Sequence, residues 1–433
     1  MSLALLGYGL VLTFMILIMT KRLSAFNALV IVPLVFGLLG GFGPQVAKFA
    51  YSGVKDVAPT ASMLLFAILF FGIMINAGLF DPLVDWVVKF VKGDPLKVLV
   101  GTAILAAVVS LDGDGSTTAM ITCSAMVPVY NRLKINKLYL ASIVIMQNCI
   151  LNLVPWGGPT ARVMAALKLD GGAILRPFLP GMILSILYVI GVAYYIGLKE
   201  RKRLGITNLE GTAKSEMAAT VTAEEEVLKR PKFIWINFIM TIIVVATLIS
   251  GAVQPAIIFE VGTALALLLN YPKLKEQSKL IQIHAPNAIQ VVLMVLAAGI
   301  FMGVLTYSKM ADAIATNLIG LIPASAGAHF PIITALISLP GTFLLSNDAF
   351  YFGVLPVLAK TGAVYGFSSL QIGVASLMGQ AVHLLSPLVA AIYLLLQLTG
   401  QDMGEWQRYT IKWCGGIFLI YVVTLVGTGF IPL

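Results

Sequence analysis

The sequence predicts an all-α polytopic membrane protein, and its composition carries most of that prediction. Of the 433 residues, 59% are hydrophobic and only 11% are charged, with a mean hydropathy of +0.97. A soluble chain has about 25% charged residues, because its surface must be covered by water. Apolar runs close to the roughly 20 residues that cross a bilayer as a helix recur from end to end. These observations exclude soluble enzymes, nucleic-acid binders and secreted disulfide scaffolds.

The first apolar run lacks a basic start and a small-residue cleavage site, which predicts a retained helix rather than a signal peptide. The net charge of +9 is distributed as clusters of Lys and Arg, and such clusters belong in the cytoplasm. This distribution orients about ten spans and places both termini outside. The spans are expected at residues 3–20, 26–43, 60–80, 138–168, 176–198, 233–250, 253–270, 286–307, 369–397 and 408–430.

Two further apolar segments, 97–131 and 330–361, do not fit as single spans. The first begins and ends beside basic clusters, and the second begins and ends in sparsely charged loops. Each segment must therefore enter and leave the membrane on one side. We expect two re-entrant hairpins, the first from the cytoplasm and the second from outside, with tips that are buried in protein or line a cavity.

The two halves of the chain align at a nearly constant offset. Gly72 and Gly299 are 227 residues apart, while the Ser-Leu-x-Gly motifs that begin at Ser110 and Ser338 are 228 apart. Further matched pairs are Asp85 with Asp312, Pro128 with Pro356, and Pro159 with Pro387. Because matched segments then face opposite sides, the pattern predicts an inverted-repeat secondary transporter. The repeats are residues 1–198 and 233–433, and the polar stretch 199–232 is expected to be a cytoplasmic linker rather than a regulatory domain.

The first hairpin carries the most polar intramembrane stretch, residues 110–118. An unpaired carboxylate at bilayer depth is costly, so Asp112 and Asp114 require a partner, water or a proton, and we expect them to bind a metal or protons. The half-helix that follows directs its N-terminal end, with the hydroxyls of Ser116, Thr117 and Thr118, toward an anion. The alternative is an aqueous turn capped by Asp and Ser, but such a turn does not need apolar flanks.

The second hairpin has a comparable tip at Ser346, Asn347 and Asp348, between apolar arms. Asp348 could simply cap the next helix, and a cap at the tip still points into the cavity, so the two interpretations are compatible. We expect Ser346 and Asn347 to bind the anion and Asp348 to bind a metal or a proton.

Each hairpin is followed by a span that breaks at mid-membrane, at residues 152–160 and 380–387. Proline and glycine free backbone groups there to coordinate a ligand, although many proline-kinked helices have no site. The residues expected to contribute are Asn152, Gly157, Gly158, Thr160 and Ser386 for the substrate and His383 for the metal. A histidine such as His383 is nevertheless more often a hydrogen-bonded core residue.

Two charged residues in apolar surroundings have open roles. Arg162 could pair with a substrate carboxylate through its planar fork, or could extend toward the membrane interface. Glu260 could make a helix-to-helix hydrogen bond, or could take part in proton coupling.

At these residues the chain resembles the citrate-metal-proton symporter family, a branch of the ion transporter superfamily, over essentially its full length. The most specific stretch is residues 111–119, supported by residues 152–160 and by the second tip. The resemblance implies a homodimer with a scaffold domain and a mobile transport domain, whose elevator-like movement carries citrate bound to a divalent metal together with protons. In the wider superfamily, Ser-Asn-Thr tips help to bind sodium. Here Asp348 replaces the third residue and two aspartates precede Ser116, which favours protons.

The resulting hypothesis is a proton-coupled importer of metal-citrate complexes in a bacterial plasma membrane, with no enzymatic activity and no cofactor beyond the transported metal. Oxygen ligands suit Mg²⁺ or Ca²⁺, and His383 would extend the range to transition metals. A carrier of free di- or tricarboxylates, or another ion/proton transporter of this architecture, is the alternative.

Two other classes of membrane protein fit the sequence less well. A channel would need a continuous polar stripe along several helices. An intramembrane metalloprotease would need closely spaced histidines, but His284, His329 and His383 lie far apart.

Overall fold

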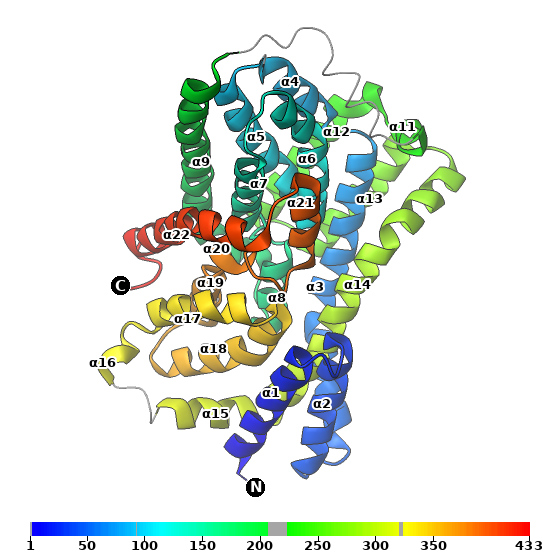
Figure 1. The fold of residues 1–433 in the computed structure, drawn as a ribbon. Coiled ribbons are helices and arrows are strands. Elements are labelled where there is room, and N and C mark those ends of the chain that lie inside the picture. The colour runs from blue at the N-terminus through cyan, green and yellow to red at the C-terminus, as the bar shows by residue number, and fades with distance from the viewer. Residues whose placement is uncertain (1, 92, 207–222, 320–323) are drawn as a thin grey trace.

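The computed structural model describes residues 2–91, 93–206, 223–319 and 324–433, and these residues form helices without strands (Figure 1). Six helices of the described chain are long and apolar enough to cross a membrane: Gln45–Asn76, Pro95–Asp112, Gly171–Leu204, Pro231–Ser250, Leu274–Tyr307 and Met403–Gly427. The prediction of an all-α, multi-pass membrane protein is confirmed. The count of ten spans stays a prediction.

The first half places two short helices before a long one, then a helical hairpin and a broken span. In order the elements are α1 (Leu3–Met19), α2 (Ala25–Leu39), α3 (Gln45–Asn76), α4 (Asp81–Val91), α5 (Pro95–Val109), η1 (Ser110–Asp112), α6 (Gly115–Arg132), α7 (Lys137–Leu151), α8 (Gly158–Leu167) and α9 (Gly171–Leu204). Polar N-cap residues mark the beginning of several helices. Asp94 accepts a hydrogen bond from the Leu96 N–H, and Asn136 accepts one from the Leu138 N–H.

The second half follows a similar order. Its elements are α11 (Ala223–Leu228), η2 (Pro231–Phe233), α12 (Ile234–Ser250), α13 (Pro255–Asn270), α14 (Leu274–Tyr307), α15 (Met310–Ile319), α16 (Ala324–Gly327), α17 (Phe330–Leu344), η3 (Ala349–Val354), α18 (Leu355–Val364), α19 (Ser369–Leu377), α20 (Gln380–His383), α21 (Ala390–Thr399) and α22 (Met403–Gly427). Helix α5 continues through η1, and together they make up the segment Pro95–Asp112 counted above, whereas α17 has 15 residues, about 22 Å of helix, which is less than the roughly 30 Å of a hydrocarbon core.

Three predicted boundaries differ from the structure. The spans expected at 60–80 and 286–307 begin earlier, because α3 starts at Gln45 and α14 at Leu274. The early turns of both helices contain charged residues that lower the local hydropathy. The linker expected at 199–232 begins inside α9, which continues to Leu204. Residues 207–222 of that linker lie outside the described residues.

The long helices α3 and α14 pack against each other more extensively than any other described pair. They approach closely at Gly53, Gly299 and Gly303, since a Cβ atom on Gly53 would lie 2.0 Å from the Gly299 carbonyl oxygen. Small residues of this kind allow two helix backbones to meet inside a membrane. The crossing therefore gives the molecule a rigid central pair of helices.

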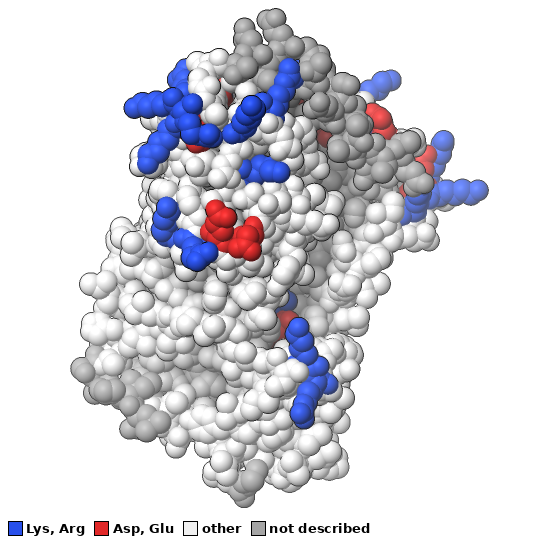
Figure 2. Space-filling model, in the orientation of Figure 1, with Lys and Arg blue, Asp and Glu red and all other residues white. Residues whose placement is uncertain are grey.

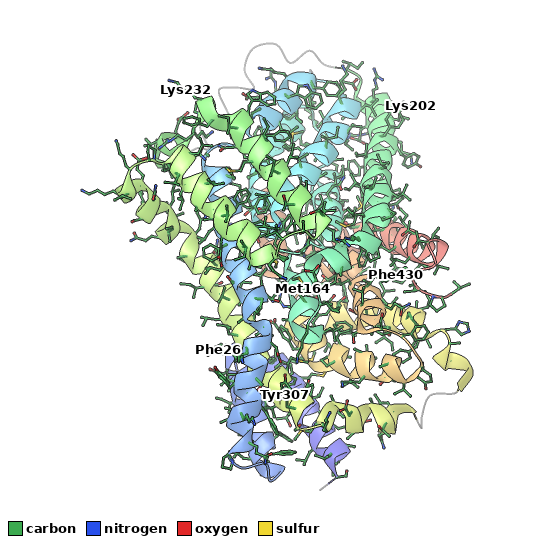
Figure 3. All side chains as sticks on the ribbon, turned by 180° about the vertical axis from the view of Figure 1, so that it is seen from behind. Phe26, Met164, Lys202, Lys232, Tyr307 and Phe430 are labelled. Atoms are coloured by element: carbon green, nitrogen blue, oxygen red, sulfur yellow. The ribbon has the colours of Figure 1, made fainter. Side chains whose placement is uncertain are left out.

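Basic side chains gather at one end of the molecule. In Figure 2 most of the Lys and Arg side chains lie over the end that carries α4, the end of α9 and the start of α14. Figure 3 places Lys202 and Lys232 at this end and Tyr307 toward the opposite one. This separation follows the charge pattern in the sequence. The assignment of the basic end to the cytoplasm stays a prediction.

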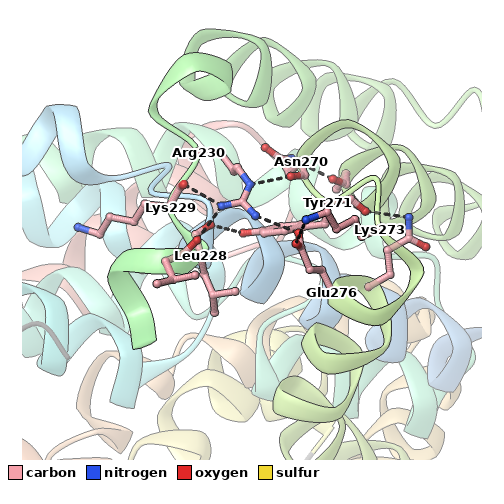
Figure 4. A network of polar contacts seen from close by, with 10 residues as sticks. Leu228, Lys229, Arg230, Asn270, Tyr271, Lys273 and Glu276 are labelled. Atoms are coloured by element: carbon pink, nitrogen blue, oxygen red, sulfur yellow. Dashed lines mark hydrogen bonds and ion pairs between the residues drawn. The ribbon is translucent and has the colours of Figure 1, made fainter. Parts of the chain in front are cut away.

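Arg230 anchors the chain at the basic end where the second half begins (Figure 4). Its guanidinium donates to the Asn270 carbonyl (2.8 Å) and to Glu276 (3.1 Å), and it lies over the ring of Tyr271. The Tyr271 hydroxyl in turn donates to the Leu228 carbonyl (2.7 Å). The end of the linker is thus fixed to α13 and α14 before α12 enters the membrane.

Candidate functional site

Two aspartates and a left-handed glycine form the tip of the first hairpin. Gly113 has φ +80°, a conformation that glycine adopts without steric cost, and it turns the chain from η1 into α6. Asp114 caps α6, because its carboxylate accepts hydrogen bonds from the Thr117 N–H (2.7 Å) and hydroxyl (2.8 Å). Asp112 accepts one from the Asp114 N–H (2.9 Å). Both carboxylates are therefore held at the N-terminal end of α6, and neither is fully buried.

Behind this tip lies a buried polar layer. Thr118 donates to the Asp114 carbonyl (2.9 Å), and its hydroxyl oxygen accepts a hydrogen bond from Asn148 of α7 (3.2 Å). The Asn148 side-chain oxygen is buried and has no partner among the described residues. Ser116 stays partly exposed on the other face of the tip.

The first broken span contacts this hairpin directly. Trp156 donates from its indole nitrogen to the Leu111 carbonyl (2.9 Å), and Thr160 donates to the Leu153 carbonyl (2.8 Å) within the break. Asn152 is partly exposed and makes no side-chain hydrogen bond in the described chain. The interruption between α7 and α8 is therefore an ordered loop that contacts the first tip.

Given the citrate transport that the resemblance implies, Gly157→Ala is expected to lower uptake at least tenfold, whereas Gly191→Ala in α9 should change it by less than threefold. A Cβ atom on Gly157 would lie 2.0 Å from the Asn152 carbonyl oxygen, so the loop must move. A Cβ atom on Gly191 meets no atom within 4 Å. Initial uptake rates, normalised to the amount of protein in the membrane, provide the comparison. Equal effects of both substitutions would contradict the loop geometry.

Backbone carbonyls at the end of α17 hold the second tip in place. His383 Nδ1 lies 2.5 Å from the Thr342 carbonyl oxygen, and Ser386 donates to the Phe343 carbonyl (2.6 Å). Ser346 accepts a hydrogen bond from the Ala349 N–H (3.2 Å), and the π-helix η3 follows. Single π-helical turns occur frequently at functional sites. Two residues of the second break, His383 and Ser386, thus fix the arm that leads to this tip.

The two halves meet at an ion pair. Arg162 Nε lies 2.7 Å from Asp348 Oδ1, and Nη1 donates to the Gly158 carbonyl (2.9 Å). The two side chains retain 22% and 16% of their accessible surface, so neither is fully buried. A small pocket adjoins the pair between α8, α14 and η3, lined by Gly158, Ala161, Arg162, Val291, Met294, Val295 and Phe352. In Figure 3, Met164 marks α8 at the centre of the molecule.

The predicted metal residues do not form one cluster in this conformation. Asp112 and Asp114 lie on the first tip, Asp348 binds Arg162, and His383 contacts backbone. Among the described residues, no three His, Cys, Asp or Glu side chains are close enough to hold a metal ion. The structure brings together Arg162, Gly158 and Asp348, and a substrate would have to complete any metal coordination.

Several buried polar residues near the tips were not among the predicted site residues. Gln147 and Asn148 of α7, Gln380 of α20 and Tyr351 of η3 are almost fully buried. The sequence did contain a signal, because two adjacent amides inside the apolar α7 segment are as unusual as the aspartates that were selected. Tyr351 has no comparable signal, since a tyrosine in an apolar segment is common.

Comparison with known proteins supports a transport function. A sequence model described as citrate transporter matches residues 14–379. The chain belongs to the citrate transporter family. It is 50% identical over 429 residues to a Bacillus subtilis (strain 168) protein named "Citrate transporter", with 99% of each chain covered. The family members are transporters and not enzymes, so the prediction that this protein is not an enzyme is confirmed.

The name of a second relative includes a divalent metal ion. The chain is 44% identical over 425 residues to the B. subtilis (strain 168) protein named "Mg(2+)/citrate complex secondary transporter", covering 98% of this chain and 97% of the other. Among solved structures, the Alcanivorax borkumensis YdaH transporter matches with a TM-score of 0.59 at 18% identity, over 90% of this chain and 89% of that one. This similarity concerns the fold alone.

Proposed function

We propose that this protein imports citrate complexed with a divalent metal ion, coupled to protons, across a bacterial plasma membrane. The ion pair of Arg162 with Asp348 carries the proposal, because it combines a guanidinium that lines a pocket with a carboxylate from the other half of the chain. Arg162 Nη2 has no partner in the described chain and can donate to a substrate carboxylate. Citrate carries about three negative charges at neutral pH, and a divalent metal reduces that to about one, which a single arginine can balance.

The proposed mechanism is an elevator built from two inverted repeats, residues 1–198 and 233–433. The similar helix order of the halves favours the repeat, and the tight glycine crossing of α3 with α14 suits a fixed scaffold. The hairpins and broken spans would form the mobile domain. In a single chain α12 leaves most of its apolar surface uncovered, and we propose that it contributes to a homodimer interface.

Within this mechanism, hydroxyls, amides and backbone groups bind citrate, and carboxylates at the two tips bind the metal or protons. The proposed citrate contacts are Ser116, Thr117, Thr118, Asn152, Gly157, Gly158, Thr160, Arg162, Ser346, Asn347 and Ser386. The proposed metal contacts are Asp112, Asp114, Asp348 and His383, of which the aspartates also carry protons. Because the described aspartates are separated here, binding would have to bring the tips toward one substrate.

Uptake of labelled citrate into proteoliposomes tests the proposed substrate. Uptake should fall to background with a chelator and return with Mg²⁺, Ca²⁺, Mn²⁺, Ni²⁺ or Zn²⁺ added separately, which also gives the metal preference. One observation favours a second candidate, a carrier of free di- or tricarboxylates: the described residues contain no cluster of metal-ligating side chains. Uptake that is unaffected by the chelator would establish that candidate and remove the first.

Asp114→Asn is expected to lower metal-citrate uptake about tenfold without lowering the melting temperature. Asparagine caps a helix as well as aspartate does, so the contact with Thr117 is retained while the negative charge is lost. Uptake rate and thermal unfolding of the purified protein are measured in parallel. A wild-type rate would show that the charge of Asp114 is not used for the metal or protons.

A further inference from the structure

Gln380 lies in the second broken span, at the start of α20, and its side chain is 1% exposed. Its amide nitrogen makes two hydrogen bonds, to Asn347 Oδ1 (3.0 Å) and to the Tyr351 hydroxyl oxygen (2.9 Å). A side-chain amide nitrogen carries two hydrogens, so both donors are used. Gln380 therefore links the break in the second half to the tip of the second hairpin.

A backbone group fixes the direction of these bonds. The Tyr351 hydroxyl donates to the Ser376 carbonyl oxygen (3.4 Å), which can only accept. Because that hydroxyl has a single hydrogen and directs it to Ser376, it accepts from Gln380, so the Gln380 nitrogen faces it. The same nitrogen then faces Asn347, so the Asn347 oxygen is directed toward Gln380. The Asn347 N–H groups are consequently directed away from Gln380.

The Asn347 N–H groups are available to a ligand. Asn347 is partly exposed, precedes Asp348 of the ion pair, and its side-chain nitrogen makes no hydrogen bond in the described chain. An N–H donor at this place suits a carboxylate, whereas the amide oxygen would repel one. The orientation of the amide thus decides whether this part of the tip attracts or repels an anion.

Gln380 is also unusual as a purely structural residue. Its side-chain oxygen is buried and has no partner among the described residues. An unsatisfied buried acceptor costs about 1–3 kcal/mol of stability. Retaining an amide at this position is therefore unfavourable for folding alone and suits a residue with a second role.

We propose that Gln380 is a positioning residue for substrate binding, which holds the Asn347 amide so that its N–H groups face a carboxylate of the transported anion. This proposal rests on the proposed function, since it assumes that the second tip binds citrate. Gln380 acts through Asn347 and does not itself need to touch the substrate.

The test measures citrate KM and maximal rate in proteoliposomes of the full-length protein, with Mg²⁺ present, at pH 7.5 and pH 5.5. Burial disfavours the ionised form of a carboxyl at position 380, so Gln380→Glu is also measured at pH 9, where the ionised carboxylate only accepts hydrogen bonds; Asn347 should then turn its N–H groups inward, and KM should rise at least tenfold over wild type. At pH 5.5 the carboxyl can be protonated and donate again. The ratio of mutant to wild-type KM should then fall at least threefold, while the maximal rates stay within threefold.

Gln380→Leu is the matched control, because it removes the amide without adding a titratable group. The ratio of its KM to the wild-type KM should be raised by the same factor at each pH. A KM of Gln380→Glu that is unchanged at pH 9, or a raised KM ratio that is the same at every pH as in the leucine variant, overturns the proposal. If Gln380→Glu fails to fold, Asn347→Asp replaces it: this variant keeps an acceptor for Gln380 but loses the donors, and a wild-type KM overturns the proposal. Absence of citrate uptake by the wild type would instead reject the proposed function.

Discussion

Arg162→Lys is expected to lower the rate of metal-citrate uptake about 100-fold while the protein stays folded in the membrane. Arg162 bonds Asp348 through Nε and the Gly158 carbonyl through Nη1, and Nη2, which has no partner in the described chain, is the donor proposed for the substrate. Lysine preserves the charge but has one nitrogen on a flexible stem, which cannot reproduce the planar fork. Loss of a hydrogen bond that involves charged groups costs up to about 3 kcal/mol, which corresponds to roughly 100-fold.

Arg176→Lys provides the matched control. Arg176 of α9 is exposed and donates to the carbonyls of Ile249 and Ser250, away from both tips. This variant should retain uptake within twofold of wild type. Initial rates of labelled citrate uptake, corrected for the amount of reconstituted protein, measure both variants. A wild-type rate and KM in Arg162→Lys would show that the guanidinium fork does not bind the substrate.

Local signals in the sequence located two helix pairs closely. The first pair, expected at 97–131, extends over Pro95–Arg132, and the second, expected at 330–361, extends over Phe330–Val364. That each pair enters and leaves the membrane on one side stays a prediction. Helices α3 and α14 begin before the spans expected at 60–80 and 286–307, because hydropathy locates apolar segments and leaves out the charged turns that precede them. In the fold, Asp56 of α3 binds Lys168 (2.6 Å), and Glu276 of α14 binds Arg230 (3.1 Å). Such partners come from distant parts of the chain, which hydropathy does not include.

Contacts between distant parts of the chain also limited the prediction of the site. The polar tips were visible in the sequence because carboxylates and amides are rare between apolar arms. The partner of Arg162 was not visible, since Asp348 is 186 positions away and the pairing depends on how the halves pack. Neither alternative for Arg162, a substrate contact or extension to the interface, included this partner. For Glu260 the structure shows a helix-to-helix contact, a hydrogen bond from Ser62 of α3 (2.7 Å).

An inward proton gradient, with sodium absent, is expected to drive accumulation of metal-citrate in proteoliposomes, and Asp348→Asn is expected to abolish that accumulation. Arg162 balances the charge of Asp348 in this conformation. A substrate carboxylate that binds Nη2 would share the single positive charge of Arg162 with Asp348, which leaves one partly buried negative charge unbalanced. Such an excess charge is strongly unfavourable unless the Asp348 carboxylate binds a proton. Substrate binding and proton uptake are thereby linked at one residue, and asparagine cannot make that link because it does not bind a proton at neutral pH.

The control for this prediction is the same substitution, aspartate to asparagine, at a residue that lies outside the proposed site. Asp170 caps α9 through the Ala173 N–H (3.0 Å) and is exposed, and asparagine serves equally well at such a cap. Asp170→Asn should therefore accumulate metal-citrate as the wild type does. The decisive measurement is the ratio of internal to external citrate with a proton gradient alone and with a sodium gradient alone. Accumulation that requires a sodium gradient and does not depend on pH would contradict proton coupling. Proton-driven accumulation by Asp348→Asn would instead place the coupling on another carboxylate, and Asp112 and Asp114 at the other tip are the candidates.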